Sequence, residues 1–113
     1  MRIDPVKRTT EAMHQGLSRA VVELRARMKW GQADLAQAIK LQGSRVHLIL
    51  TPDQGTISRW ERCQSAPSQQ HRMVLSRISS KNGHEDLAEL FRAPVSAWRL
   101  VGHVRLGLKD DRS

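Results

Sequence analysis

The sequence predicts a small, mainly α-helical protein that forms one domain. Apolar residues recur at helical spacing in five separate stretches, and residues that favour turns or helix caps stand between these stretches. The chain has 113 residues, of which 39% are hydrophobic, so it can build one modest core. No apolar run approaches the roughly 20 residues of a membrane span, so we expect no membrane partner.

The first helix is expected over residues 11–29, after a lead-in over residues 1–10 that is either loose or the start of the helix. One face of this helix would carry four apolar residues at spacings of four, three and four: Leu17, Val21, Leu24 and Met28. Gly31 is suited to the left-handed turn that follows a helix, so we expect the helix to end there.

A second helix is expected over "QADLAQAIK", residues 32–40, with three residues facing the core: Leu35, Ala36 and Ile39. The stretch that follows, "LQGSRVHLILTP", should break at Gly43 and again at Pro52. Within it three apolar residues alternate with other residues: Val46, Leu48 and Leu50. This alternation predicts a short strand, for which the alternating run at 98–108 is a candidate partner.

The third helix is expected over "DQGTISRWE", with Asp53 or Thr51 as its N-terminal cap. Ile57 and Trp60 lie three residues apart and would both face the core. The opposite face would carry small residues and two long cations: Gly55, Ser58, Arg59 and Arg62. A helix that meets only water more often carries Glu/Lys pairs four residues apart. The face is therefore typical of one that lies close against a flat, anionic surface.

Two more helices are expected in the second half of the chain. Ser68 would cap a helix over residues 69–80, whose inward residues would be Val74, Leu75 and Ile78. Asn82-Gly83 is a strong turn signal. The fifth helix, "HEDLAELF", would bury Leu87, Leu90 and Phe91 and end at or before Pro94. The run at 98–108 fits a strand by its alternation and a helix by an apolar stripe, and both remain open.

The charge of the chain points to an anionic partner. Lys and Arg number 19 against 11 Asp and Glu, a net charge of +8. No acid lies between Asp34 and Asp53, and none lies between Glu61 and Glu85. A small domain this basic is expected to bind polyanions. The single cysteine excludes an internal disulfide framework and fits a reducing, cytoplasmic environment.

The motifs now support a comparison with a known family. "LRARMKWGQADLAQAI" followed by "TISRWERCQSAPSQQHR" resembles the lambda-repressor/Cro-like helix-turn-helix family, also called the xenobiotic-response-element type. The match extends from Leu17 to Ile78. It implies a lambda-repressor-like five-helix fold with an extended connection between the second and third helices, in which residues 11–80 form the helix-turn-helix DNA-binding domain. Residues 81–113 would then be a C-terminal helix and tail, and a candidate dimerisation segment.

The resemblance also implies roles for individual residues on double-stranded DNA. Base contacts, or contacts to nearby phosphates, would come from five residues of the third helix: Gln54, Gly55, Thr56, Ser58 and Arg59. Gln32 would hold a phosphate at the start of the second helix, where the helix dipole also favours an anion. Further phosphate contacts are predicted for Arg45, Arg62, His71 and Arg72. Arg25 and Glu61 match a family pair that ties the first helix to the third, although two independent surface charges remain an alternative.

Two features depart from the family pattern. Family members usually join the second and third helices by a turn of about three or four residues, because the two helices pack as a unit. Here the segment is much longer, so either the helices still dock while residues 43–52 loop out, or the angle between the helices changes. Cys63 stands where the family commonly has Gly, at a position expected to be left-handed.

We expect a transcription regulator, specifically a repressor that binds as a homodimer to half-sites about 34–36 Å apart. Three apolar residues are candidates for the dimer surface or, equally, for the domain's own core: Phe91, Trp98 and Leu106. The scattered histidines form no zinc spacing with Cys63, and no phosphate loop or nucleophile elbow occurs, so we expect no enzyme, metal or cofactor. The alternative is an antitoxin that binds a toxin through its tail and regulates its own operon.

Overall fold

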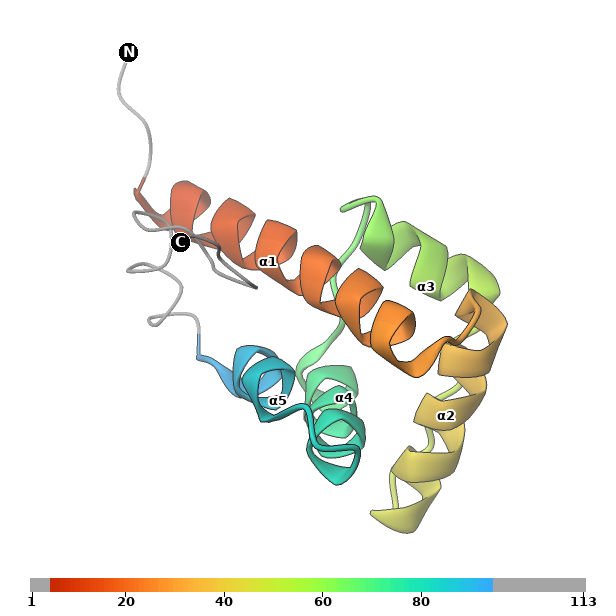
Figure 1. Cartoon of the computed structure of the whole chain (residues 1–113). Helices are drawn as coiled ribbons and strands as arrows, with labels where there is room; N and C mark the ends of the chain where they lie inside the picture. The colour runs from red at the N-terminus through yellow and green to blue at the C-terminus, as the bar shows by residue number, and fades with distance from the viewer. Residues whose placement is uncertain (1–4, 95–113) are drawn as a thin grey trace.

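The computed structural model describes residues 5–94. Within this range the chain forms five helices and no strand: α1 (Pro5–Met28), α2 (Gln32–Arg45), α3 (Gln54–Glu61), α4 (Gln69–Lys81) and α5 (Glu85–Arg92). The long α1 crosses the molecule, with α3 on one side of it and α4 and α5 on the other, while α2 stands at one end (Figure 1). None of these helices is long and apolar enough to cross a membrane. The expected mainly helical domain with five helices is thus confirmed.

The first helix begins at Pro5, six residues before the expected position at residue 11. Proline is well suited to the first turn of a helix, because the N–H that it lacks would have no partner there. At the other end, the prediction for Gly31 is wrong. Lys29 is the left-handed residue, with φ 59°, whereas Gly31 is extended and caps α2, its N–H donating to the Asp34 carboxylate at 2.8 Å. Because α2 starts at Gln32, the residue before it must be extended, and the reversal falls two residues earlier.

The core lies where the helices meet and draws on every one of them. Most of the predicted inward residues are fully buried: Leu17, Val21, Leu24, Leu35, Ile39, Ile57, Val74, Leu75 and Leu87. Met28 and Leu90 are only partly buried and pack against this cluster. Phe91 is 1% exposed and is therefore part of the domain's own core, not a dimer surface. Trp98 and Leu106 lie outside the described residues.

An ion pair joins α1 to α5 at the edge of this core. The guanidinium of Arg27 donates to both carboxylate oxygens of Asp86, at 2.9 and 2.8 Å. These hydrogen bonds lower the pKa of Asp86 to about 2. Because the Asp86 side chain is 56% exposed, solvent screens the pair, and we expect it to contribute less than about 1 kcal/mol.

The predicted strand at 46–50 is wrong. Instead of breaking at Gly43, α2 continues to Arg45, and the chain then reverses through His47, whose φ is 62°. The N–H of Leu48 donates to the Gly43 carbonyl at 2.9 Å, and a Cβ on Gly43 would lie only 3.2 Å from the Leu48 carbonyl oxygen. The returning backbone thus passes close against α2, where it has no second strand to pair with among the described residues. The candidate partner at 98–108 lies outside the described residues.

The alternation that predicted a strand still reflects burial. Leu50 is 8% exposed and belongs to the core, and Val46 and Leu48 pack against it. Ile49, between them, is 94% exposed. A coil segment lying along a helix can therefore bury alternate side chains as a strand does.

The predicted caps of α3 and α4 are confirmed. The Asp53 carboxylate accepts the Thr56 N–H at 2.8 Å, so Asp53 and not Thr51 caps α3. The Ser68 hydroxyl accepts the His71 N–H at 3.3 Å at the start of α4. The turn after α4 passes through Gly83, whose φ is 82°.

Cys63, just after α3, is left-handed as expected, with φ 58°. A side chain in this conformation costs roughly 1–2 kcal/mol, whereas glycine adopts it freely but loses more entropy on folding. We therefore predict that Cys63→Gly raises the free energy of unfolding by about 0.5–1 kcal/mol in urea melts. Cys63→Ala keeps the backbone penalty and serves as the control. A glycine variant no more stable than the alanine variant would contradict the interpretation.

Candidate nucleic-acid interface

The exposed face of α3 gathers the five residues that were predicted to contact bases. Gln54, Gly55 and Arg59 are exposed, and Thr56 and Ser58 are half-buried. On the opposite face Ile57 is fully buried and Trp60 is 3% exposed. The helix is thus anchored along one side by two apolar residues, and the other side meets solvent.

Gly55 has no internal reason to be a glycine. It lies in the first turn of α3, and its φ is not in the left-handed range. A Cβ at this position would lie 3.4 Å from the Asp53 carboxylate and 3.5 Å from the Arg59 guanidinium, which are ordinary contacts. Glycine in a helix is less favourable than alanine by up to about 1 kcal/mol. The missing side chain therefore leaves space on the outside of the helix and not within the fold.

Arg59 extends along the exposed face toward the start of α3. Its guanidinium donates to the Thr56 hydroxyl at 3.4 Å, and that hydroxyl donates to Asp53 at 2.9 Å. The backbone and hydroxyl hydrogen bonds from Thr56, with the nearby charge of Arg59, lower the pKa of Asp53. A guanidinium has five N–H donors, and most of those on Arg59 have no partner among the described residues, so they can bind an external acceptor.

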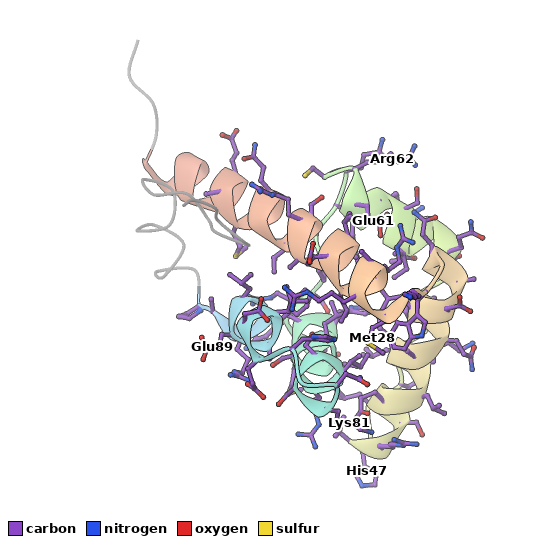
Figure 2. All side chains as sticks on the ribbon, viewed as in Figure 1. Met28, His47, Glu61, Arg62, Lys81 and Glu89 are labelled. Atoms are coloured by element: carbon purple, nitrogen blue, oxygen red, sulfur yellow. The ribbon has the colours of Figure 1, made fainter. Side chains whose placement is uncertain are left out.

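The carboxylate of Glu61 connects three helices. Arg25 of α1 donates to it twice, from Nε at 2.5 Å and from Nη2 at 2.9 Å, and Gln32 of α2 donates from Nε2 at 3.0 Å. Figure 2 shows Glu61 at the end of α3, on the side that faces α1. The predicted Arg25–Glu61 pair is therefore present, and the alternative of two independent surface charges is wrong.

The bond from Gln32 was not predicted. Its side chain was expected to hold a phosphate, yet one of its two amide N–H groups is used inside the protein. The second has no partner among the residues that the structure describes, so an internal bond and an external one are compatible. The spacing of the motif placed Gln32 at the start of α2, but sequence alone carried no sign that this residue would meet Glu61.

The other predicted phosphate contacts are spread more widely. Arg62 is exposed and directly follows α3. Arg72 donates to the Ala93 carbonyl at 3.1 Å and so secures the end of α5. Arg45 ends α2, and at about 1.5 Å per residue it lies roughly 20 Å along that helix from Gln32. Arg45 is therefore far from the site at the other end of α2.

His71 has internal partners as well. Its ring packs edge-on against Trp60 at a centroid distance of 5.2 Å, and its Nδ1 is hydrogen-bonded to the Ser68 hydroxyl at 2.8 Å. Burial lowers the pKa of His71, because the charged imidazolium is less well solvated there. His71 thus packs against the buried face of α3 through Trp60, in addition to any contact that it makes outside the protein.

Comparison with known proteins identifies no relative: no family model, curated protein or solved structure matches this chain.

The Glu61 connection makes a pH-dependent contribution to stability. Burial raises the pKa of Glu61. The hydrogen bonds from Arg25 and Gln32 and the charge of Arg25 lower it, and together they outweigh burial, so the pKa lies below its ordinary 4.5. A lowered pKa in the folded state stabilises the protein above the ordinary pKa, and this contribution disappears as the pH falls through the folded-state value. We predict that Glu61→Gln lowers the free energy of unfolding by about 1–3 kcal/mol at about pH 7.

Urea melts should show this difference narrowing as the pH falls below about 4.5. Asp53 and Asp86 titrate in both proteins, so their effects cancel in the comparison. A difference that stays constant down to about pH 3 would mean that the charge of Glu61 contributes nothing.

Proposed function

We propose that this protein is a sequence-specific DNA-binding transcription regulator that inserts α3 into the major groove of double-stranded DNA. The observation that carries the proposal is the pairing of a buried Ile57–Trp60 face with an exposed face of small residues and Arg59. Small residues allow a helix to approach the base edges closely, and an arginine guanidinium fits the O6/N7 edge of guanine. The net charge of +8 supports attraction to the phosphate backbone.

The specific fold that we propose is the lambda-repressor/Cro-like helix-turn-helix. The long connection between α2 and α3 could instead mean that the angle between these two helices differs from that of the family. Two observations support a docked pair: α2 packs against α3, and Gln32 reaches Glu61 at 3.0 Å. Residues 46–53 then run back beside α2 without separating the two helices.

In this arrangement Gln32 donates its second amide N–H to a phosphate beside the α2 N-terminus, where the helix dipole favours an anion. Arg62 reaches the backbone from the end of α3. We further propose repression by a homodimer on half-sites about 34–36 Å apart, since one half-site offers little selectivity. The segment proposed for dimerisation is residues 81–113, whose tail would bind a toxin in the alternative function. The structure describes this segment only as far as residue 94.

The variant Arg59→Ala tests whether Arg59 recognises a base. After selection of the preferred site from a random library, the variant should bind that site about 1–3 kcal/mol more weakly and lose its preference at one base pair per half-site. Arg77→Ala, which removes the same charge from an exposed position on α4, is the control. Equal losses on the preferred site and on random DNA would show that Arg59 contacts only phosphate.

Gly55→Ala separates stability from binding. The added methyl group makes only ordinary contacts inside the protein, so the variant should be at least as stable as the parent, by up to about 1 kcal/mol. At a closely packed groove the same methyl group should weaken specific binding by roughly 1–3 kcal/mol. Unchanged specific binding would show that α3 does not approach DNA at Gly55.

A further inference from the structure

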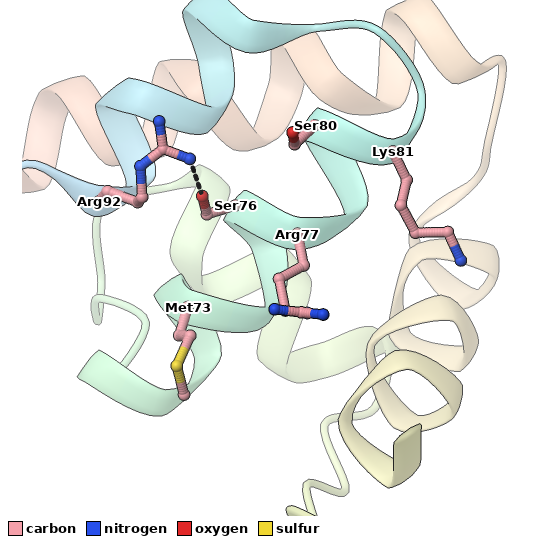
Figure 3. A pocket seen from close by; sticks show the side chains of 6 residues that line it. All are labelled: Met73, Ser76, Arg77, Ser80, Lys81 and Arg92. Atoms are coloured by element: carbon pink, nitrogen blue, oxygen red, sulfur yellow. Dashed lines mark hydrogen bonds between the residues drawn. The ribbon is translucent and has the colours of Figure 1, made fainter. Parts of the chain in front are cut away.

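A second basic surface lies along α4. It contains a shallow pocket of about 380 Å³ lined by Met73, Ser76, Arg77, Ser80, Lys81 and Arg92 (Figure 3). A smaller hollow of about 140 Å³ lies between α2 and α4. The two hollows share Lys81, and the smaller one adds Leu41 and Arg45 of α2. We call this continuous area the α4 surface.

One methionine and two cations of the α4 surface are regularly arranged along the helix. Met73, Arg77 and Lys81 follow one another at four-residue spacing, so they form a row along one face of α4 at about 6 Å per step. Arg92 is positioned from α5, because its guanidinium donates to the Ser76 hydroxyl at 3.1 Å. That hydroxyl is buried and in turn donates to the Ala88 carbonyl at 3.1 Å.

The positive charge of this surface is largely uncompensated. Glu85 lies at its edge, where it accepts a hydrogen bond from Ser80 and lies 3.8 Å from Arg92. Among the side chains that the structure describes, those of residues 11–94, no carboxylate is within ion-pair distance of Arg77 or Lys81. These cations can therefore pair with anionic groups of a ligand.

The α4 surface is separate from the exposed face of α3. In Figure 2, Arg62 lies near the top of the molecule and Lys81 near the bottom, and α1 passes between them. A ligand on the α4 surface would not occupy the site proposed for bases.

Apolar side chains decide which kind of anion fits. Met73 is 47% exposed and Leu41 is 54% exposed, one in each hollow. A nucleic-acid backbone has no apolar side chains to place there, whereas an acidic amphipathic segment of a protein has both carboxylates and apolar anchors. A second copy of this chain carries the same positive surface and a net charge of +8, so it is a poor complement.

We propose that the α4 surface binds an acidic amphipathic segment of a partner protein. Carboxylates of that segment pair with Arg77, Lys81 and Arg92, and apolar side chains enter the hollows beside Met73 and Leu41. The inference does not rest on the proposed DNA binding.

The test uses the full-length protein and a fluorescein-labelled synthetic peptide of about 16 residues, with leucines on one helical face and glutamates elsewhere. The parent should bind it in fluorescence anisotropy, and added salt should weaken the binding. The double variant Arg77→Glu/Lys81→Glu should bind roughly 10-fold or more weakly. The control is Arg19→Glu/Lys40→Glu, which makes the same charge change at exposed residues outside both hollows and should bind within about 3-fold of the parent.

Two further measurements of peptide binding complete the test. Met73→Ala should weaken peptide binding by a few-fold, and a peptide with glutamine in place of glutamate should bind much more weakly than the acidic one. Equal losses in the two double variants, or no binding by the parent, would overturn the proposal. It would also be overturned if Arg77→Glu/Lys81→Glu left peptide binding intact and instead reduced binding to random duplex DNA or self-association.

Discussion

The carboxylate of Glu61 is the point on which the position of α3 depends. Its side chain is 10% exposed, a depth at which a charge is stable only with close partners, and it has them in Arg25 and Gln32. The Glu61 carbonyl also accepts the Ser18 hydroxyl at 2.8 Å. With only Ile57 and Trp60 as buried anchors, a short helix could rotate about its own axis. The polar connections to α1 and α2 restrict that rotation and so determine which residues face outward.

The residues proposed to contact DNA therefore differ in whether they also make contacts inside the protein. Gln54, Gly55 and Arg59 are exposed, and their side chains contribute little to the packing of the domain. His71 and Arg72 hold Trp60 and the end of α5, so a change at either residue alters folding together with any contact to a phosphate. Gln32 lies between these cases, because one of its amide N–H groups orients α2 against Glu61 while the other remains available.

The positive charge of the chain is divided between two sides of the molecule. The acid-free stretch between Glu61 and Glu85 supplies both Arg62 beside α3 and the row that includes Arg77 on α4. Helix periodicity and the turn between α3 and α4 direct these cations to different faces, although they are close in sequence. Net charge therefore predicts attraction to anions in general. We propose that the residues beside the cations, small ones on α3 and exposed apolar ones on the α4 surface, determine which anion suits each face.

Sequence alone determined those features that depend on local spacing. Short-range patterns predict the helical periodicity of α1 and α4, the caps Asp53 and Ser68, and the burial of Ile57 and Trp60. The left-handed Cys63 was expected from the family resemblance. Tertiary structure decided what depends on neighbours distant in sequence. Residues 46–50 alternate like a strand, but a strand needs a partner to satisfy its backbone, and this segment lies against α2 instead. Likewise the Gln32–Glu61 bond spans 29 residues, a separation over which no local pattern can indicate that two side chains will meet.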